Sequence, residues 1–124
     1  MSQEKTREKE NENSAREKKL ASTIGLCKRA GYLVFGTPMV CDAMRKRAGI
    51  VMVLEASDTS DNTHEKLVSK CAFYGVPLHR IPLSTQGLGR CIGKLGAVAA
   101  VGITNKDLAI AIQRNLSPQG DDLK

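Results

Sequence analysis

The segment at residues 50–55, Ile-Val-Met-Val-Leu-Glu, constrains the fold of this chain more than any other. A near-continuous apolar run of this length is typical of a central strand whose two faces are both covered. Such a strand needs helices above and below its sheet. The rest of the sequence therefore has to supply two helical layers.

Short β-branched runs alternate with amphipathic helical patterns along the chain. We expect strands at residues 32–35, 50–55, 76–82 and 97–103. Helix starts are expected at Ser14 with Glu17 as a capping box, at Thr37 as N-cap before Pro38, within 57–62, at Ser84, and at Thr104 with Asp107 as a second capping box. Five helices and four strands in this order predict a three-layer α/β/α sandwich around a four-stranded mixed sheet.

The length of 124 residues and the 41% apolar content suit one compact domain. We assign it to residues 14–116, with tails at 1–13 and 117–124. Residues 1–13 have no apolar side chain after the initiator Met, which predicts a disordered charged tail. No apolar run approaches the length of a membrane span, and no signal peptide is visible, so we expect a cytoplasmic protein.

The charge is concentrated in the predicted domain. Residues 20–116 carry twelve Lys and Arg against six Asp and Glu, whereas residues 1–19 carry six against five. A basic domain suits a polyanionic partner. The four cysteines form no Cys-x-x-Cys pair and are predicted to be free, buried thiols.

Candidates for catalysis are few. His64 lies beside Glu65 and Lys66 in a predicted helix and is interpreted as solvated, and no metal-ligand or nucleophile spacing occurs. Gly87, Gly89 and Gly93 are spaced one residue too widely for a dinucleotide-binding loop. We therefore predict no catalytic residue, no metal site and no cofactor, and a non-enzymatic protein.

Two segments suit a phosphate backbone. The helix start at Gly36 offers unpaired N–H groups, and the second segment, after Gly87, offers Arg90 and Lys94. Gly89 and Gly93 fit close packing as well as close approach to a ligand. In the predicted fourth helix we expect Leu88, Cys91, Ile92 and Leu95 to face the core.

Two basic groups at helix ends have a simpler interpretation. Arg45-Lys46-Arg47 and Lys28-Arg29 each suit a solvated helix end that complements the helix dipole. Arg45 and Lys46 gain interest only if they lie beside the Gly36 segment. For Lys28 and Arg29 we favour the helix-end interpretation.

Several motifs resemble the ribosomal protein L7Ae/L30e family, and the closest likeness is to its short bacterial members of the YlxQ type. The resemblance covers residues 20–115 and rests on Gly-Leu-Cys-Lys-Arg-Ala-Gly at 25–31, Gly36-Thr37, Leu-Glu-Ala-Ser-Asp at 54–58, Leu88-Gly89-Arg90 and Gly93-Lys94. It implies an α/β/α sandwich that binds structured RNA, typically a kink-turn, a duplex bent sharply at sheared G·A pairs.

The chain departs from the family pattern at the helix start after the first strand. The family has Gly-x-Asn-Glu there, with a Lys three residues past the Glu, and these side chains contact guanine edges. The matching positions are Pro38, Met39 and Asp42, so the base-reading set is missing. The resemblance places a second RNA contact at 94–97, where apolar side chains can pack on a flipped nucleotide.

We accordingly expect a monomeric, ribosomal-protein-like RNA-binding protein of translation or ribosome assembly, with ribosomal or other structured RNA, and also the ribosome or translation factors, as partners and no membrane partner. The alternative is a protein-interaction or scaffold module of the same fold whose RNA site has decayed. The RNA-binding candidates are Gly36, Thr37, Pro38, Met39, Arg45, Lys46, Arg90, Lys94, Leu95, Gly96 and Ala97.

Overall fold

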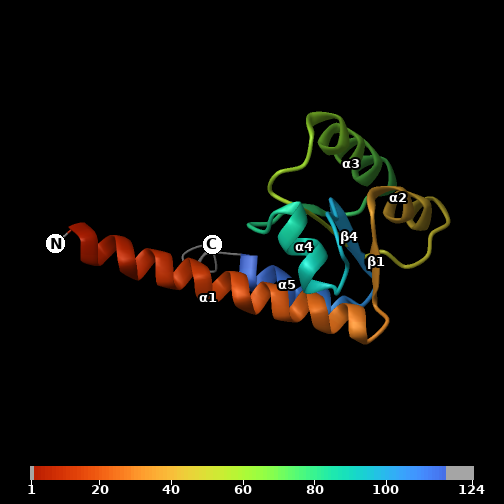
Figure 1. Ribbon diagram of the computed structural model, residues 1–124. Coiled ribbons are helices and arrows are strands. Elements are labelled where there is room, and N and C mark those ends of the chain that lie inside the picture. The colour runs from red at the N-terminus through yellow and green to blue at the C-terminus, as the bar shows by residue number, and fades with distance from the viewer. Residues whose placement is uncertain (1, 117–124) are drawn as a thin grey trace.

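A computed structural model describes the backbone of residues 2–116 and the side chains of residues 15–116 (Figure 1). The elements are α1 Ser2–Arg29, β1 Leu33–Phe35, α2 Thr37–Arg45, β2 Met52–Glu55, α3 Asp61–Tyr74, β3 Leu78–Arg80, α4 Thr85–Cys91, β4 Ala100–Ile103 and α5 Lys106–Leu116. The predicted order of helices and strands is confirmed. The tail predicted at 117–124 lies outside the described residues.

The four strands form one mixed sheet in the order β1-β4-β2-β3. Strand β4 pairs antiparallel with both β1 and β2, and β2 pairs parallel with β3. Every residue of β2 and β4 is buried, as the apolar run at 50–55 predicted. The sheet therefore has short edge strands, β1 and β3, around a fully covered centre.

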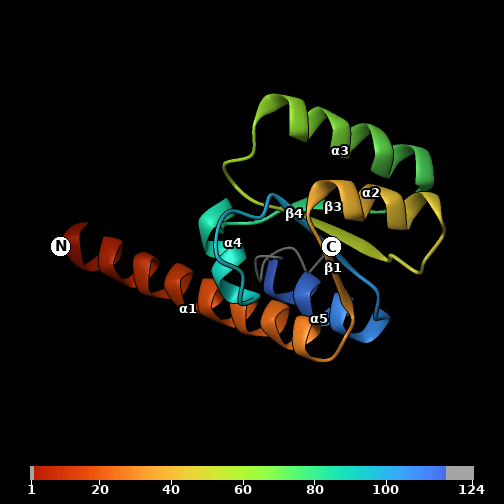
Figure 2. The same cartoon turned by 45° about the vertical axis from the view of Figure 1, so that its right-hand side comes forward.

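Helices cover both faces of the sheet (Figure 2). One core lies between the sheet and α1, α4 and α5, and includes Leu20, Leu54, Leu88 and Ile112. The second lies between the sheet and α2 and α3, and includes Val40, Val53 and Leu67. These two cores confirm the three-layer α/β/α sandwich.

Helix α1 begins at Ser2, upstream of the capping box predicted at Ser14. Glu, Lys, Arg and Gln are all good helix formers, and a helix already anchored by Leu20, Ile24 and Cys27 can extend through such residues. In Figure 1 the N-terminal part of α1 projects beyond the rest of the domain.

The start of α5 also differs from the prediction. The Oδ1 atom of Asn105, not the Thr104 side chain, accepts a hydrogen bond from the Leu108 N–H at 2.9 Å. Asn is at least as good an N-cap as Thr. Asn105 lies three residues before Leu108, whose N–H has no partner within the helix. The starts of α3 and α4 agree with the predictions. Ser60, which caps α3, lies within the predicted range 57–62, and Ser84 caps α4 as predicted.

Candidate nucleic-acid interface

The backbone reverses direction between β1 and α2 at Gly36, which has φ 90° and ψ 136°. A side chain at this position would be strained by the dihedral angle alone, since a Cβ here would meet no atom within 4 Å. Because this turn makes Gly36 the N-cap, Thr37 is the first helical residue and not the predicted cap. No side chain caps α2.

The start of α2 leaves two N–H groups free of helical partners. The Gly36 N–H donates to the Ala100 carbonyl at 2.9 Å, and Pro38 has no N–H. The first N–H with a partner inside the helix is that of Val40, which donates to the Gly36 carbonyl. Thr37 and Met39 therefore supply the free N–H donors at this corner.

The second segment is the turn after α4, residues 92–97. Helix α4 ends at Cys91, and the chain then turns through Gly93 and Gly96, which both have positive φ. A Cβ on Gly89 would lie 2.0 Å from the Gly96 carbonyl oxygen, so Gly89 is required for the turn to pack back on α4. The structure thus gives Gly89 a packing role.

Leu95 does not face the core. Because α4 stops four residues earlier, Leu95 lies in the turn and its side chain is fully exposed, which corrects the prediction that it faces inward. Lys94, Gly96 and Ala97 are exposed as well, and so are Pro38 and Met39 at the start of α2. Apolar side chains on both segments are thus accessible to a partner.

The two segments meet at Phe35. The Lys94 ammonium nitrogen lies 4.9 Å from the centre of the Phe35 ring, and Phe35 is the residue directly before Gly36. Phe35 also pairs in register with Val101 of β4, the strand that the turn leads into. The predicted convergence of the Gly36 segment and the 94–97 segment is therefore present in the structure.

Sequence reasoning missed two residues of this corner, Phe35 and Lys28. The Lys28 ammonium nitrogen, from the last turn of α1, lies 5.9 Å from the centre of the same Phe35 ring. We call Lys28, Phe35 and Lys94 the Phe35 cluster. The adjacency of Phe35 to Gly36 was visible in the sequence, but nothing local connects Lys28 to Lys94.

Other predicted cations lie elsewhere. Arg45 and Lys46 are at the far end of α2, about 12 Å along the helix axis from Thr37. Each forms an ion pair with Asp42, at 2.6 and 3.0 Å, and we call these three residues the Asp42 cluster. Hydrogen bonds from Arg45 and then Lys46 hold the pKa of the Asp42 carboxyl below its ordinary value.

Arg90 is exposed on α4 and lines a shallow hollow of about 350 Å³ together with Glu17 and Lys18 of α1. The structure thus places Lys94 at the Phe35 corner, leaves Arg45 and Lys46 paired at a distance, and sets Arg90 beside an acidic neighbour on α1.

His64 is not simply solvated as predicted. Its Nδ1 atom lies 2.9 Å from both carboxylate oxygens of Glu55, which is fully buried, and the Thr59 hydroxyl donates to the same carboxylate. The sequence pattern hides this pair because Glu55 ends an apolar strand nine residues before His64. The pair ties α3 to the end of β2.

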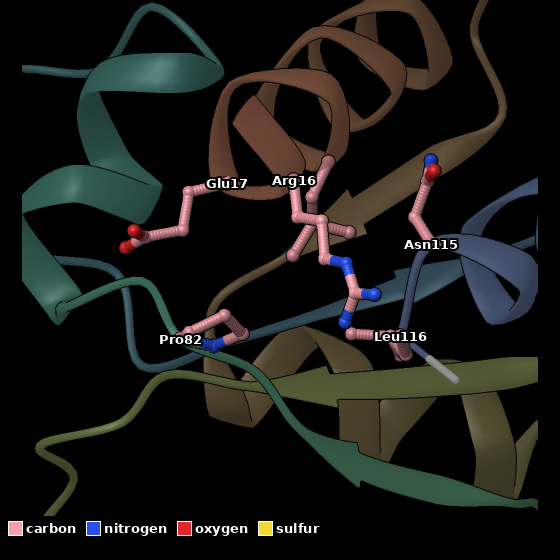
Figure 3. A pocket seen from close by; sticks show the side chains of 6 residues that line it. Arg16, Glu17, Pro82, Asn115 and Leu116 are labelled. Atoms are coloured by element: carbon pink, nitrogen blue, oxygen red, sulfur yellow. The ribbon is translucent and has the colours of Figure 1, made fainter. Parts of the chain in front are cut away.

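A hollow of about 440 Å³ lies between α1, α5 and Pro82, where the charged ends of Arg16 and Glu17 point apart (Figure 3). Residues 15–116 contain no group of three His, Cys, Asp or Glu side chains placed to hold a metal ion. None of the described helices combines the length and apolar character needed to cross a bilayer.

The cysteines are free thiols, and burial raises the pKa of Cys27, Cys71 and Cys91, that of Cys71 to about 11. These thiols therefore stay protonated at neutral pH, where a thiol is a poor nucleophile and metal ligand.

Comparison with known proteins agrees with this fold. Residues 18–112 match the model of the ribosomal protein L7Ae/L30e/S12e/Gadd45 family. The RNA-binding protein YlxQ of Bacillus subtilis is 38% identical over 87 residues, which are 69% of this chain and 83% of that protein. The RNA-binding protein YlxQ of Enterococcus faecium is 35% identical over 83 residues, which are 66% of this chain and 78% of that protein.

Two solved structures share the architecture. A protein of unknown function from Bacillus halodurans superposes with a TM-score of 0.71 at 28% identity, covering 79% of this chain and 96% of its own. The Giardia lamblia 15.5kD RNA binding protein superposes with a TM-score of 0.65 at 18% identity, covering 82% and 85% of the two chains, a likeness of fold. The family match spans most of the domain, and the chain belongs to the ribosomal protein L7Ae/L30e/S12e/Gadd45 family.

Proposed function

We propose that this chain is a non-enzymatic, cytoplasmic RNA-binding protein that takes structured RNA at the corner where α2 begins and the 92–97 turn ends. The observation that carries the proposal is the Lys94 ammonium over Phe35, which brings a cationic turn to the free N–H groups of Thr37 and Met39. N–H groups at a helix start and lysine side chains both bind phosphate oxygens.

Three further observations support the proposal. The described domain is basic, with twelve Lys and Arg against six Asp and Glu in residues 20–116, which suits a polyanion. The B. subtilis and E. faecium relatives, each more than a third identical to this chain, are named RNA-binding proteins. The exposed Leu95 and Ala97 can contact an unstacked base, as RNA recognition often requires.

We further propose that kink-turn selectivity is weak. Pro38 and Met39 offer no side-chain donor or acceptor to a guanine edge, and each good bidentate base contact contributes about 1–3 kcal/mol. Asp42 is occupied by Arg45 and Lys46, so it replaces the expected Lys without presenting a free charge to phosphate. Affinity then comes mainly from contacts with the sugar-phosphate backbone of the RNA and less from hydrogen bonds to base edges.

A salt titration tests RNA binding itself. The full chain is titrated with a kink-turn RNA and with the same duplex lacking the G·A pairs, at several salt concentrations. Log affinity should fall against log salt by about 0.7–0.9 for each phosphate neutralised. We expect binding to both RNAs with less than tenfold preference for the kink-turn. Failure to bind any structured RNA at low salt would end the proposal.

Restoring the family side chains tests the selectivity claim. Pro38→Asn with Met39→Glu should raise affinity for the kink-turn RNA and leave affinity for the unkinked duplex nearly unchanged, because only the former exposes guanine edges to α2. Pro38→Ala with Met39→Ala is the matched control, since it changes the same positions without adding hydrogen-bonding groups. Equal affinities of the two double variants would contradict the assignment of these positions.

A second candidate function is a protein-interaction module, and the exposure of Met39 and Leu95 favours it. Exposed apolar side chains on two adjoining segments suit a protein partner as well as a base. A complex that survives nuclease treatment and is lost on Met39→Ser with Leu95→Ser would support this candidate.

The main proposal also includes a role in translation or ribosome assembly, contact with the ribosome, and a monomeric state. Analytical ultracentrifugation tests the monomeric state.

A further inference from the structure

Lys28 and Lys94 come from distant parts of the sequence to one aromatic ring. Lys28 ends α1, Lys94 follows α4, and their ammonium nitrogens lie 5.9 and 4.9 Å from the centre of the Phe35 ring. An ammonium group within about 6 Å of a ring centre is attracted by the negative face of the ring. The arrangement thus places both ammonium nitrogens at the same aromatic ring.

These two charges are not balanced by neighbouring carboxylates. Within residues 15–116, the ion pairs involve Arg45, Lys46 and His64, and neither Lys28 nor Lys94 forms one. A ring quadrupole attracts a cation but carries no net charge, so it cannot neutralise two of them. Like charges held together are satisfied best by an anion from outside.

Phe35 gives the two lysines a fixed support. Its ring is half-buried and packs against the core formed by the sheet with α1, α4 and α5. A free lysine side chain loses rotamer entropy when it binds. Lysines already placed over a rigid ring lose less of it, so the Phe35 cluster is preorganised for a ligand.

The cluster is also next to the proposed RNA site. Phe35 directly precedes Gly36, and the free N–H groups of Thr37 and Met39 follow within four residues. An anion held by Lys28 and Lys94 would therefore be continuous with one that approaches the start of α2. In both ribbon views the end of α1 leads through a short turn directly into β1 (Figures 1 and 2).

We infer that Lys28 and Lys94, supported by Phe35, form a phosphate-binding site that extends the RNA interface from α2 onto the end of α1. This inference rests on the proposed RNA-binding function and adds to it Lys28 and Phe35. The ligand is the sugar-phosphate backbone of the bound RNA, and Phe35 orients the lysines without stacking on a base. The helix-end interpretation of Lys28 is replaced by a binding role.

The test measures affinity and its salt dependence for the full chain and five variants, with the RNA that the wild type binds more tightly. Lys28→Gln removes one charge from the cluster, Lys28→Arg keeps it, and Phe35→Leu removes the ring but keeps an apolar side chain. Lys106→Gln is the matched control, because Lys106 is an exposed lysine of α5 without an ion pair in the described residues. Lys94→Gln serves as the second cluster variant.

We expect Lys28→Gln and Lys94→Gln each to weaken binding about threefold to tenfold at low salt and to lower the salt slope by about 0.7–0.9. Lys28→Arg should keep the wild-type slope, and Lys106→Gln should change little. Phe35→Leu should weaken binding about twofold to fivefold, from loss of the cation–π support. A variant that is merely misfolded would lower the active fraction and leave the slope unchanged.

Three results would overturn the inference in different ways. If the wild type binds RNA and Lys28→Gln matches Lys106→Gln in affinity and slope, the Phe35 cluster is not a phosphate site although the protein binds RNA. If the wild type binds no structured RNA at low salt, the proposed function and this inference fall together. If Phe35→Leu instead abolishes binding while both lysine variants bind normally, Phe35 acts as a stacking platform and the inference is wrong.

Discussion

The Asp42 cluster and the Phe35 cluster contain two cations each, yet they differ in what surrounds the charge. Arg45 and Lys46 reach Asp42 within one helical turn, at 2.6 and 3.0 Å. Lys28 and Lys94 reach only the uncharged ring of Phe35. The carboxylate of Asp42 compensates part of the positive charge of the first cluster, whereas the ring of Phe35 leaves the positive charge of the second cluster uncompensated. The number of basic residues therefore does not locate a binding site. What locates it is whether those residues already have an anionic partner within the protein.

Gly89→Ala should have the largest effect of the changes that separate the two clusters. The new Cβ would lie 2.0 Å from the Gly96 carbonyl oxygen, so the 92–97 turn has to move and take Lys94 with it. We expect a loss of about 1–3 kcal/mol in the free energy of unfolding, the usual cost of overpacking, and a marked loss of RNA affinity. Chemical denaturation and RNA titration measure the two effects.

Gly87→Ala is the control for that change, because a Cβ at Gly87 meets only the Ser84 hydroxyl, at 3.4 Å. It should be neutral or slightly stabilising, since alanine is the better helix former. Equal stability losses for Gly87→Ala and Gly89→Ala would mean that the turn is not held by contact with Gly89.

Removing both charges of each cluster compares the two directly. Lys28→Gln with Lys94→Gln should weaken RNA binding about 10–30-fold at low salt, or about 1.4–2 kcal/mol, and lower the salt slope by about 1.4–1.8. Arg45→Gln with Lys46→Gln removes the same formal charge and should cost less than about threefold, because exposed ion pairs with Asp42 already occupy those cations. Equal losses would show that net charge alone determines binding.

Gly36→Ala should act on the start of α2 without touching either cluster's cations. The φ of 90° at Gly36 is unfavourable for a residue with a Cβ, so we expect a loss of about 1–2 kcal/mol in unfolding free energy and a shift of the Thr37 and Met39 N–H groups. Thr37→Ala changes the neighbouring side chain and should leave stability close to wild type, since the Thr37 side chain caps nothing. Denaturation curves and amide chemical shifts of Thr37 and Met39 give the readout.

Sequence reasoning predicted what depends on neighbours in the chain. The central strand within 50–55, a cap within 57–62, the cap Ser84 and the order of elements follow from local patterns, and the structure agrees with them. The pairing of Asp42 with Arg45 and Lys46 was not predicted, although it too lies within about one helix turn.

What sequence reasoning missed depends on contacts across the fold. Lys28 and Lys94 are brought together only by the packing of α1 and the 92–97 turn against β1, and the contact of His64 with buried Glu55 joins two elements. The exposure of Leu95 follows from Gly89 packing against Gly96, which ends α4 before a helical pattern alone would. The close approach of Gly89 and Gly96 produces no periodic pattern in the sequence from which it could be predicted.

Asp42→Asn should give the smallest effect and tests whether pairing is what keeps the Asp42 cluster from binding. The change releases Arg45 and Lys46, so RNA affinity at low salt should rise about twofold to threefold, the energy of an exposed ion pair, and the salt slope should steepen. An unchanged affinity would instead mean that Arg45 and Lys46 do not contribute to RNA binding because they lie far from the Phe35 corner, and not because they are paired.

The same carboxyl predicts a pH dependence. Because Arg45 and Lys46 depress the pKa of Asp42 in the folded state, its contribution to stability is present above the ordinary carboxyl pKa and is lost as pH falls through the lowered value. Asp42→Asn should remove that small acid-side loss of stability, and carboxyl titration by NMR should find the pKa of Asp42 below the ordinary value of an aspartate. Since salt screens exposed pairs, added salt should bring the pKa of Asp42 back toward its ordinary value; a lowered pKa that persists at high salt would contradict pairing as its cause.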